Sequence, residues 1–332
     1  MNLIEMVKAA GVVGAGGADF PTHVKLNTNV EYFIVNAAEC EPLIETDKYL
    51  CRTFADRIIR TIPQIAEAIG ASKKVIALKG AYEKEIAALK VAIREQNSDV
   101  EIFELGYFYP AGDEQTLIQQ VTGRCVPERG LPSDVGCVVD NVGTVLNIAD
   151  ALEGKAVTEK YLSVVGEVEH PIQLRVPIGT PVLECVKAAH PTVSDFALIM
   201  GGPMMGKQLT EQAAMEQAVV TKTTGNILVL PKDHYLFRKA SLPMETVRKQ
   251  TKSACLQCKM CTELCPRYLI GHQIHPNLMM RGLWLEPTIT DNEEYLRMYG
   301  EAANCCSCGV CEMFACPMGL SPRKVNDYFK AE

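Results

Sequence analysis

Hydrophobic and polar positions along the first half of the chain follow two alternating periods. Short apolar runs at residues 31–35, 74–79 and 100–105 have the length and composition of buried strands. Between them, residues 48–70 and 83–96 repeat apolar positions at helical spacing, with an interruption expected near Pro63. This alternation predicts an α/β fold in which helices pack on a mostly parallel sheet.

The remaining segments of this half complete a first domain. Residues 2–10 have helical spacing, a helix is expected to open at Asp113 and Glu114, and another is expected to end near Leu152. Residues 126–139 are rich in proline and glycine and are expected to wrap around the surface. We therefore place the first domain at residues 1–157.

The pattern changes near residue 158. Strands are predicted at 161–168, 172–176, 196–200 and 225–231, with one helix ending at Ala189. Two strands, a crossover helix and further strands predict a small β-grasp module at residues 158–232. After a linker at 234–243, residues 233–332 form a helical domain that ends in a short polar helix or tail.

Composition narrows the class of protein. With 332 residues, 48% of them hydrophobic, the chain is long enough for two or three domains with buried cores. A net charge of -7 argues against nucleic acid as a partner. No apolar run approaches the ~20 residues of a membrane span, and the N-terminus does not resemble a signal peptide. Fourteen cysteines then indicate a reducing compartment, by default the cytoplasm.

Eight of the cysteines form two repeated runs, each with three thiols at every third residue and a fourth before a proline. Three such thiols can bind one iron–sulfur cubane, whereas the fourth lies too far along the chain and binds the neighbouring cluster. The spacing of the eight cysteines predicts two [4Fe-4S] clusters. The first is assigned to Cys255, Cys258, Cys261 and Cys316, and the second to Cys305, Cys308, Cys311 and Cys265.

Other uses of these thiols fit less well. Structural zinc sites use separated pairs of cysteines, and cysteines three apart cannot form unstrained disulfides. Cys306 lies outside the repeat and is predicted to be a bystander. The second run has four residues between Cys311 and Cys316 where the first run has three, which predicts a small bulge. Two adjacent clusters would conduct single electrons.

Two other segments of the first domain are candidate sites. Residues 11–17 are dense in glycine, but they follow a helix where a dinucleotide fingerprint follows a strand, so a ligand loop and a tight turn both remain open. Residues 36–42 place an amide and two carboxylates after a predicted strand, at the edge where α/β sheets bind ligands. A solvated acidic loop is the alternative. The glycine-rich loop at 201–206 is equally open.

These segments, taken in order, resemble the electron-input proteins of the RnfC and PduS type. The first domain of that family is similar to the flavin-bearing, NADH-oxidising subunit of respiratory complex I. The resemblance extends over essentially the whole chain and is carried by both cysteine runs and by five motifs, at residues 14–25, 36–42, 109–114, 141–144 and 201–206. It implies a Rossmann-like flavin domain, a β-grasp domain of the SLBB type and a dicluster ferredoxin-like domain.

The resemblance also implies FMN and NADH as cofactors and assigns residues to them. The implied cofactor-binding residues are Gly14, Gly16, Gly17, Phe20, Thr22, Lys25, Asn36, Asp113, Glu114, Asn141 and Thr144. The implied catalytic residues are Glu39 and Glu41. Two positions depart from the family pattern, since Asp19 replaces a glycine and Gly143 replaces a glutamate.

The resulting hypothesis is an NADH-dependent reductase that passes electrons through FMN and both clusters. The expected acceptor is a corrinoid, a corrinoid enzyme or another redox protein. The alternatives are a subunit of a membrane ferredoxin:NAD oxidoreductase, as in RnfC, and an electron-transfer adaptor that has lost its flavin. The resemblance adds two specific locations, a bacterial microcompartment and the periphery of the inner membrane, with homo-oligomers or docking to a larger complex.

Overall fold

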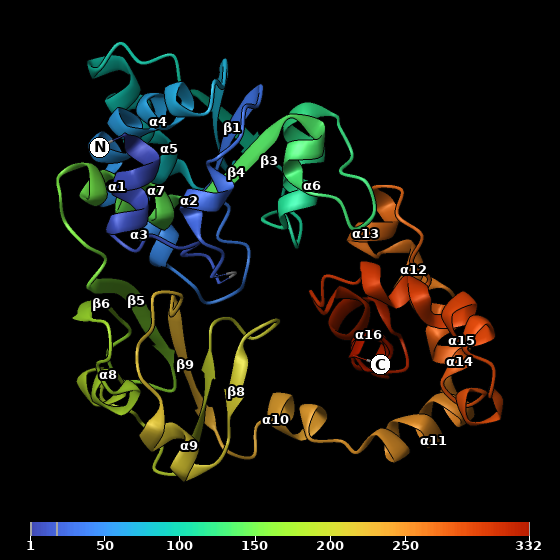
Figure 1. The fold of residues 1–332 in the computed structure, drawn as a ribbon. Coiled ribbons are helices and arrows are strands. Elements are labelled where there is room, and N and C mark those ends of the chain that lie inside the picture. Colours follow the sequence, from blue (N-terminus) through green and yellow to red (C-terminus); the bar gives the residue numbers. More distant parts are fainter. Residues whose placement is uncertain (1, 18, 332) are drawn as a thin grey trace. The chain divides into compact units, whose positions relative to one another are not determined.

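The computed structural model describes residues 2–17 and 19–331, which form two compact units (Figure 1). The first unit contains the described residues up to Arg124 together with Pro132–His234. The second contains Tyr235 onward and also the short segment Cys125–Leu131. This segment therefore packs with the C-terminal unit, although the chain on either side of it belongs to the first.

The first unit begins with the predicted parallel sheet. Its described strands lie in the order β3-β2-β1-β4, and all neighbours are parallel. The strands are β1 (Tyr32–Asn36), β2 (Lys73–Lys79), β3 (Glu101–Leu105) and β4 (Cys137–Asn141). The helical elements around them are α1 (Leu3–Ala9), α2 (Thr22–Lys25), α3 (Thr46–Thr53), α4 (Ala55–Ala68), α5 (Glu83–Glu95), α6 (Glu114–Thr122), the 3-10 turn η1 (Pro132–Val135) and α7 (Val142–Leu152). The predicted α/β class is confirmed.

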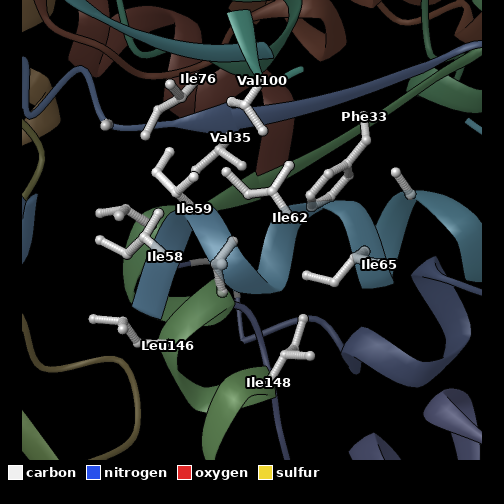
Figure 2. Close-up of a cluster of buried hydrophobic side chains, with 14 of the residues drawn as sticks. Phe33, Val35, Ile58, Ile59, Ile62, Ile65, Ile76, Val100, Leu146 and Ile148 are labelled. Atoms are coloured by element: carbon white, nitrogen blue, oxygen red, sulfur yellow. The ribbon is translucent and has the colours of Figure 1, made fainter. Parts of the chain in front are cut away.

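Helices α4 and α7 build the main core against this sheet. Figure 2 shows Ile58, Ile59 and Ile62 of α4 next to Val35 of β1, with Ile148 of α7 on the other side of the helix. These side chains are fully buried. Burial of a side chain of this size contributes roughly 1.5–3 kcal/mol, so this contact fixes the strands whose ends carry the polar candidates.

Two predictions for this region are wrong. The helical segment 48–70 is interrupted at Phe54, whose backbone is non-helical (φ -123°, ψ 24°), while Pro63 lies inside α4. The apolar positions of α4 continue past Pro63, and their burial holds the helix together. The segment 126–139, expected to wrap around the surface, ends in β4, which pairs with β1 and whose first four residues are buried. The strand was not predicted because the prolines and glycines that precede it indicated a loop.

The second sheet of the first unit lies in the predicted β-grasp region. Its described strands have the order β6-β5-β9-β7-β8, with β5 and β9 parallel and the other pairs antiparallel. The elements are β5 (Glu159–Gly166), β6 (Ile172–Pro177), α8 (Val182–Ala188), β7 (Phe196–Met200), β8 (Lys207–Leu209), α9 (Gln212–Gln217) and β9 (Asn226–Pro231). Both β8 and α9 are short and were not predicted. The boundary at residues 157–158 stays a prediction.

The second unit is helical, as predicted. Its elements are α10 (Tyr235–Ala240), α11 (Met244–Ala254), α12 (Met260–Glu263), α13 (Pro266–Leu269), α14 (Pro276–Gly282), η2 (Glu286–Thr288), α15 (Asn292–Tyr299), η3 (Gly300–Asn304), the π-helical turn η4 (Cys311–Ala315) and α16 (Pro322–Ala331). Helix α10 occupies part of the segment expected to be a linker. The terminal helix α16 is amphipathic, since Val325 and Phe329 are buried against α14 and η3.

Candidate functional site

The two candidate asparagines lie side by side at the carboxyl edge of the first sheet. Asn36 ends β1 and Asn141 ends β4, and the two residues are partners in the strand register. Strand order reverses between β1 and β4, and such a switch point is where open α/β sheets bind ligands. Asn36 Nδ2 donates to the carbonyl of Gly112 at 2.9 Å, which attaches the 109–114 loop to this edge.

The glycine loop at residues 14–17 reaches the same edge. The Ala15 amide donates to Thr144 Oγ1 at 2.9 Å. A Cβ on Gly16 would lie 3.2 Å from Asn141 Cβ, so the loop packs directly on the start of α7. Gly17 has φ 113°, and nothing lies within 4 Å of its Cβ position. The loop therefore presents open backbone beside the two asparagines, as a cradle for a ligand must.

The two departures from the family pattern behave differently. Asp19 has φ 52°, in the left-handed region that favours glycine. Aspartate is one of the side chains that tolerate this region. Gly143 donates its amide to Asn141 Oδ1 at 2.8 Å, and a Cβ there would lie 3.0 Å from that oxygen. The missing side chain at 143 thus accommodates a tight cap of α7.

Lys25 lies in a charged cluster that the sequence did not reveal. Its Nζ is 2.9 Å from Glu114 Oε1 and 3.7 Å from Asp140 Oδ1, and it also donates to the Val139 carbonyl. Burial raises the pKa of Asp140 to about 6, although Lys25 opposes this shift. Asp140 was not predicted as a site residue. The sequence signal that could have identified Asp140 is its position after a buried strand and directly before Asn141.

Two polar atoms in this neighbourhood lack a protein partner. Within the described part of the chain, Asp140 Oδ2 and Thr22 Oγ1 are buried and form no hydrogen bond. Buried polar groups without partners are rare in native proteins and commonly mark a bound water or ligand. Phe20 is 49% exposed and Asp113 caps α6 by accepting from the Thr116 amide at 3.1 Å.

The two predicted catalytic carboxylates are both held by backbone amides. Glu39 has φ 34°, and its Oε2 accepts from the Asp47 amide at 2.8 Å. Burial, followed by the charge of Asp47, raises the pKa of Glu39 well above its usual value. Glu41 Oε2 accepts from the Met204 amide at 3.0 Å, which brings the 201–206 loop to the same region. That loop therefore contacts the candidate site.

The eight cysteines of the second unit form two groups. Cys255, Cys258, Cys261 and Cys316 line one pocket. Burial raises the pKa of Cys261 to about 12, and the charges of Cys255, Cys316 and Cys258 contribute to this shift, as expected for four neighbouring thiols. Around Cys311, burial is again the largest cause of a raised pKa, followed by the charges of Cys305 and Cys265.

The two cysteine runs share one backbone conformation. Gln257 and Ser307, each two residues after the first cysteine of its run, have φ 53° and 55°. Lys259 and Gly309, two residues later, have φ 65° and 82°. The shared left-handed positions give both runs the same turn, and in the first run the three thiols line one pocket. The extra residue after Cys311 is absorbed by the π-helical turn η4, which confirms the predicted bulge.

Within the described residues, no helix is long and apolar enough to cross a membrane.

Comparison with known proteins identifies both ends of the chain. Residues 7–150 match the Nuo51 FMN-binding domain family and residues 254–321 match the 4Fe-4S dicluster domain family. The cobalamin reductase PduS of Citrobacter freundii is 44% identical over 99% of this chain and 70% of its own length. A subunit of the Na⁺-translocating ferredoxin:NAD⁺ oxidoreductase complex of Acetobacterium woodii is 33% identical over 84% of this chain and 61% of its own.

A solved structure shares the fold. An NAD⁺-reducing [NiFe]-hydrogenase in the H₂-reduced state superimposes with a TM-score of 0.65 at 20% identity. The match covers 99% of this chain and 61% of the hydrogenase chain.

Proposed function

The chain belongs to the family of the cobalamin reductases PduS, and from this premise we propose that it oxidises NADH and passes the electrons to a corrinoid. The two domain families that the chain matches show an electron-transfer oxidoreductase with FMN and two [4Fe-4S] clusters. NADH, the corrinoid acceptor and the individual site residues are our proposals.

The observation that carries the proposal is the convergence at the carboxyl edge of the first sheet. Asn36, Asn141 and the glycine loop meet there, with Lys25 supplying a cation and Gly17 leaving its side-chain position open. Buried Thr22 Oγ1 and Asp140 Oδ2 still lack partners among the described residues. A glycine loop, a lysine and unsatisfied polar atoms suit the phosphate and ring edge of FMN.

The arrangement of the thiols in the second unit supports two iron–sulfur clusters. The three thiols of the first run line one pocket together with Cys316 from the second run. The proposed ligands are the two predicted quartets. When bound, FMN converts the electron pair of a hydride into single electrons, which clusters accept one at a time. In each turnover, NADH yields NAD⁺, a proton and two electrons, and two cobalt(III) corrinoids each take one electron to become cobalt(II).

The residues of the chain divide this work. Lys25 and the glycine loop would bind and orient FMN, while exposed Phe20 and the acids Glu114 and Asp113 would border the nicotinamide and ribose. Glu39 and Glu41 stay proposals for the catalytic step. Because both accept from backbone amides, their first contribution is to fix the 36–42 loop and the 201–206 loop.

The experiment is an anaerobic NADH titration of protein reconstituted with FMN, iron and sulfide. Flavin absorbance, cluster EPR and corrinoid absorbance are followed together. We expect flavin bleaching, then EPR signals from reduced clusters, then one cobalt(II) for each electron. Iron without flavin in the presence of excess FMN would exclude the reductase and favour the adaptor. Rapid reduction of a ferredoxin but not of a corrinoid would favour the RnfC-like role. Docking to a microcompartment or membrane complex stays a prediction.

A further inference from the structure

A buried lysine from the second sheet reaches the glycine loop. Lys160, on β5, is only 8% exposed, and its Nζ donates to the Ala15 carbonyl at 3.1 Å. The Ala15 amide is already bound by Thr144 from α7. One residue of the loop is thus held through its amide by the first sheet's domain and through its carbonyl by the second.

Lys160 also faces two partly buried carboxylates. Burial lowers the pKa of Lys160 to about 8, and it outweighs the opposing charges of Asp47 in α3 and Glu39 in the loop after β1. Asp47 Oδ2 accepts from Asn141 Nδ2 at 2.6 Å, and its amide donates to Glu39. Lys160 therefore stands at the centre of a network that includes three proposed site residues, Asn141, Thr144 and Glu39.

The position of β5 is itself fixed by buried hydrogen bonds. Thr46, the first residue of α3, donates to the Gly225 carbonyl at 2.7 Å and lies 3.2 Å from Ser163 Oγ. Ser163 in turn donates to Asn226 Oδ1 at 2.8 Å. A second lysine of this domain, Lys222, donates to the Gly11 carbonyl at 2.5 Å. Two lysines of the second sheet's domain thus bind carbonyls on either side of the turn into the loop.

A buried ammonium group is costly unless it is paired and hydrogen-bonded. If Lys160 served only to balance the charge of Asp47, it would need to lie near Asp47 but would need no hydrogen bond to the loop. Lys160 instead donates a hydrogen bond to the neutral backbone carbonyl of Ala15 in the glycine loop. We propose that Lys160 is a positioning residue for FMN, which holds Ala15 so that residues 14–17 keep the shape that receives the flavin. The second sheet's domain then forms part of the flavin site. This inference rests on the proposed flavin-dependent function.

Three variants test the inference by FMN titration of flavin-free protein, followed by flavin fluorescence. K160M removes the donor, and D47N/K160M removes the donor and one facing charge. K187M is the matched control, because Lys187 of α8 has an exposed side chain that pairs with Glu184 at 2.7 Å. We expect K160M to raise the Kd for FMN about tenfold or more, with iron content unchanged. K187M should bind as wild type does.

The double variant separates positioning from charge balance. If Lys160 only neutralises Asp47, D47N/K160M regains wild-type affinity, and the inference fails. If Lys160 holds the loop, the double variant stays weak. A K160M affinity within twofold of wild type would also overturn the inference.

Hydrogen exchange gives a readout that needs no bound flavin. In flavin-free protein, K160M should speed amide exchange at residues 14–17 and leave buried β1 protected; equal rates at the loop would overturn the inference. Wild-type protein supplies the measurement if K160M does not fold. There, FMN should slow exchange in both the loop and β5, and protection of the loop alone would count against the role of Lys160. Wild-type protein that binds no FMN would instead refute the proposed function, while the flavin-free exchange still tests the contact.

Discussion

The proposed cluster ligands and the proposed flavin site at the carboxyl edge of the first sheet, here called the flavin edge, are built in opposite ways. Each cysteine run places three thiols on one short loop, and two left-handed residues at the same offsets shape both loops. At the flavin edge, by contrast, the candidate residues come from segments that are far apart in the sequence. Asn36 and Asn141 meet through strand pairing, Lys25 meets Asp140 from a different element, and Lys160 arrives from another sheet.

This difference predicts how each site responds to substitution. A cluster ligand is a covalent partner, so its loss removes a whole cofactor. A residue of the flavin edge shares its task with hydrogen-bonded neighbours, so its loss changes affinity or pH dependence by smaller amounts. The following substitutions examine this contrast.

The largest expected effect comes from removing two cysteines at once. In the crossed assignment, Cys255 and Cys316 serve the same cluster, so C255S/C316S should keep about four of about eight irons. Cys305 serves the other cluster, so C305S/C316S should lose nearly all iron. Iron and sulfide analysis of anaerobically purified protein measures both.

The uncrossed assignment reverses these two results. It would put Cys255 with Cys265 and Cys305 with Cys316, so that C255S/C316S would lose both clusters. The single variants C255S and C316S serve as controls, because each should retain about half of the iron under either assignment.

A smaller effect is expected at Asp140. Because burial raises its folded pKa to about 6, the folded protein binds a proton more tightly than the unfolded chain, and the resulting stability is lost as pH rises through 6. From pH 5 to pH 8 this loss is about 1.4 kcal/mol. D140N should remove that part of the pH dependence of flavin-free protein, as measured by thermal unfolding.

Lys25 bears on the size of this effect. Burial lowers the pKa of Lys25, but the charges of Asp140 and Glu114 more than offset this and raise it. D140N therefore also removes a charged partner of Lys25, which changes stability by itself. For this reason the quantity to compare is the slope of stability against pH, and not the stability at a single pH. D195N, at an exposed position, is the control. An unchanged slope in D140N would show that Asp140 stays ionised throughout this range.

A third, smaller effect is expected at Asp19. Its left-handed backbone suits glycine, and its carboxylate repels an anionic ligand. D19G should tighten FMN binding about two- to fivefold, and more at low ionic strength. D19N distinguishes the two causes, because it removes the charge and keeps the Cβ. Fluorescence titration at two salt concentrations measures both, and weaker binding in both variants would mean that Asp19 helps to bind the flavin.

The same contrast explains what could be predicted from sequence. Thiol spacing predicted both loops and the turn after Cys311, because ligand geometry is a local property. Asp140 and Lys160 were missed because their importance depends on which strands become neighbours, and β4 was hidden by the prolines and glycines before it. Likewise, the predicted break near Pro63 was wrong because the buried face of α4 continues past this proline, and the break lies at Phe54.

The smallest expected effect belongs to Cys306. This thiol lies near Cys305, Cys308 and Cys265, whose raised pKa values it contributes to, so proximity alone would make it a candidate ligand. Spacing argues otherwise, since Cys306 has no counterpart in the first run, where Leu256 takes its place. C306S should therefore retain about eight irons, whereas C305S should fall to about four. If C306S loses a cluster, cysteine spacing does not suffice to identify the ligands. The second cluster would then be formed by residues that the fold brings together, as the flavin edge is.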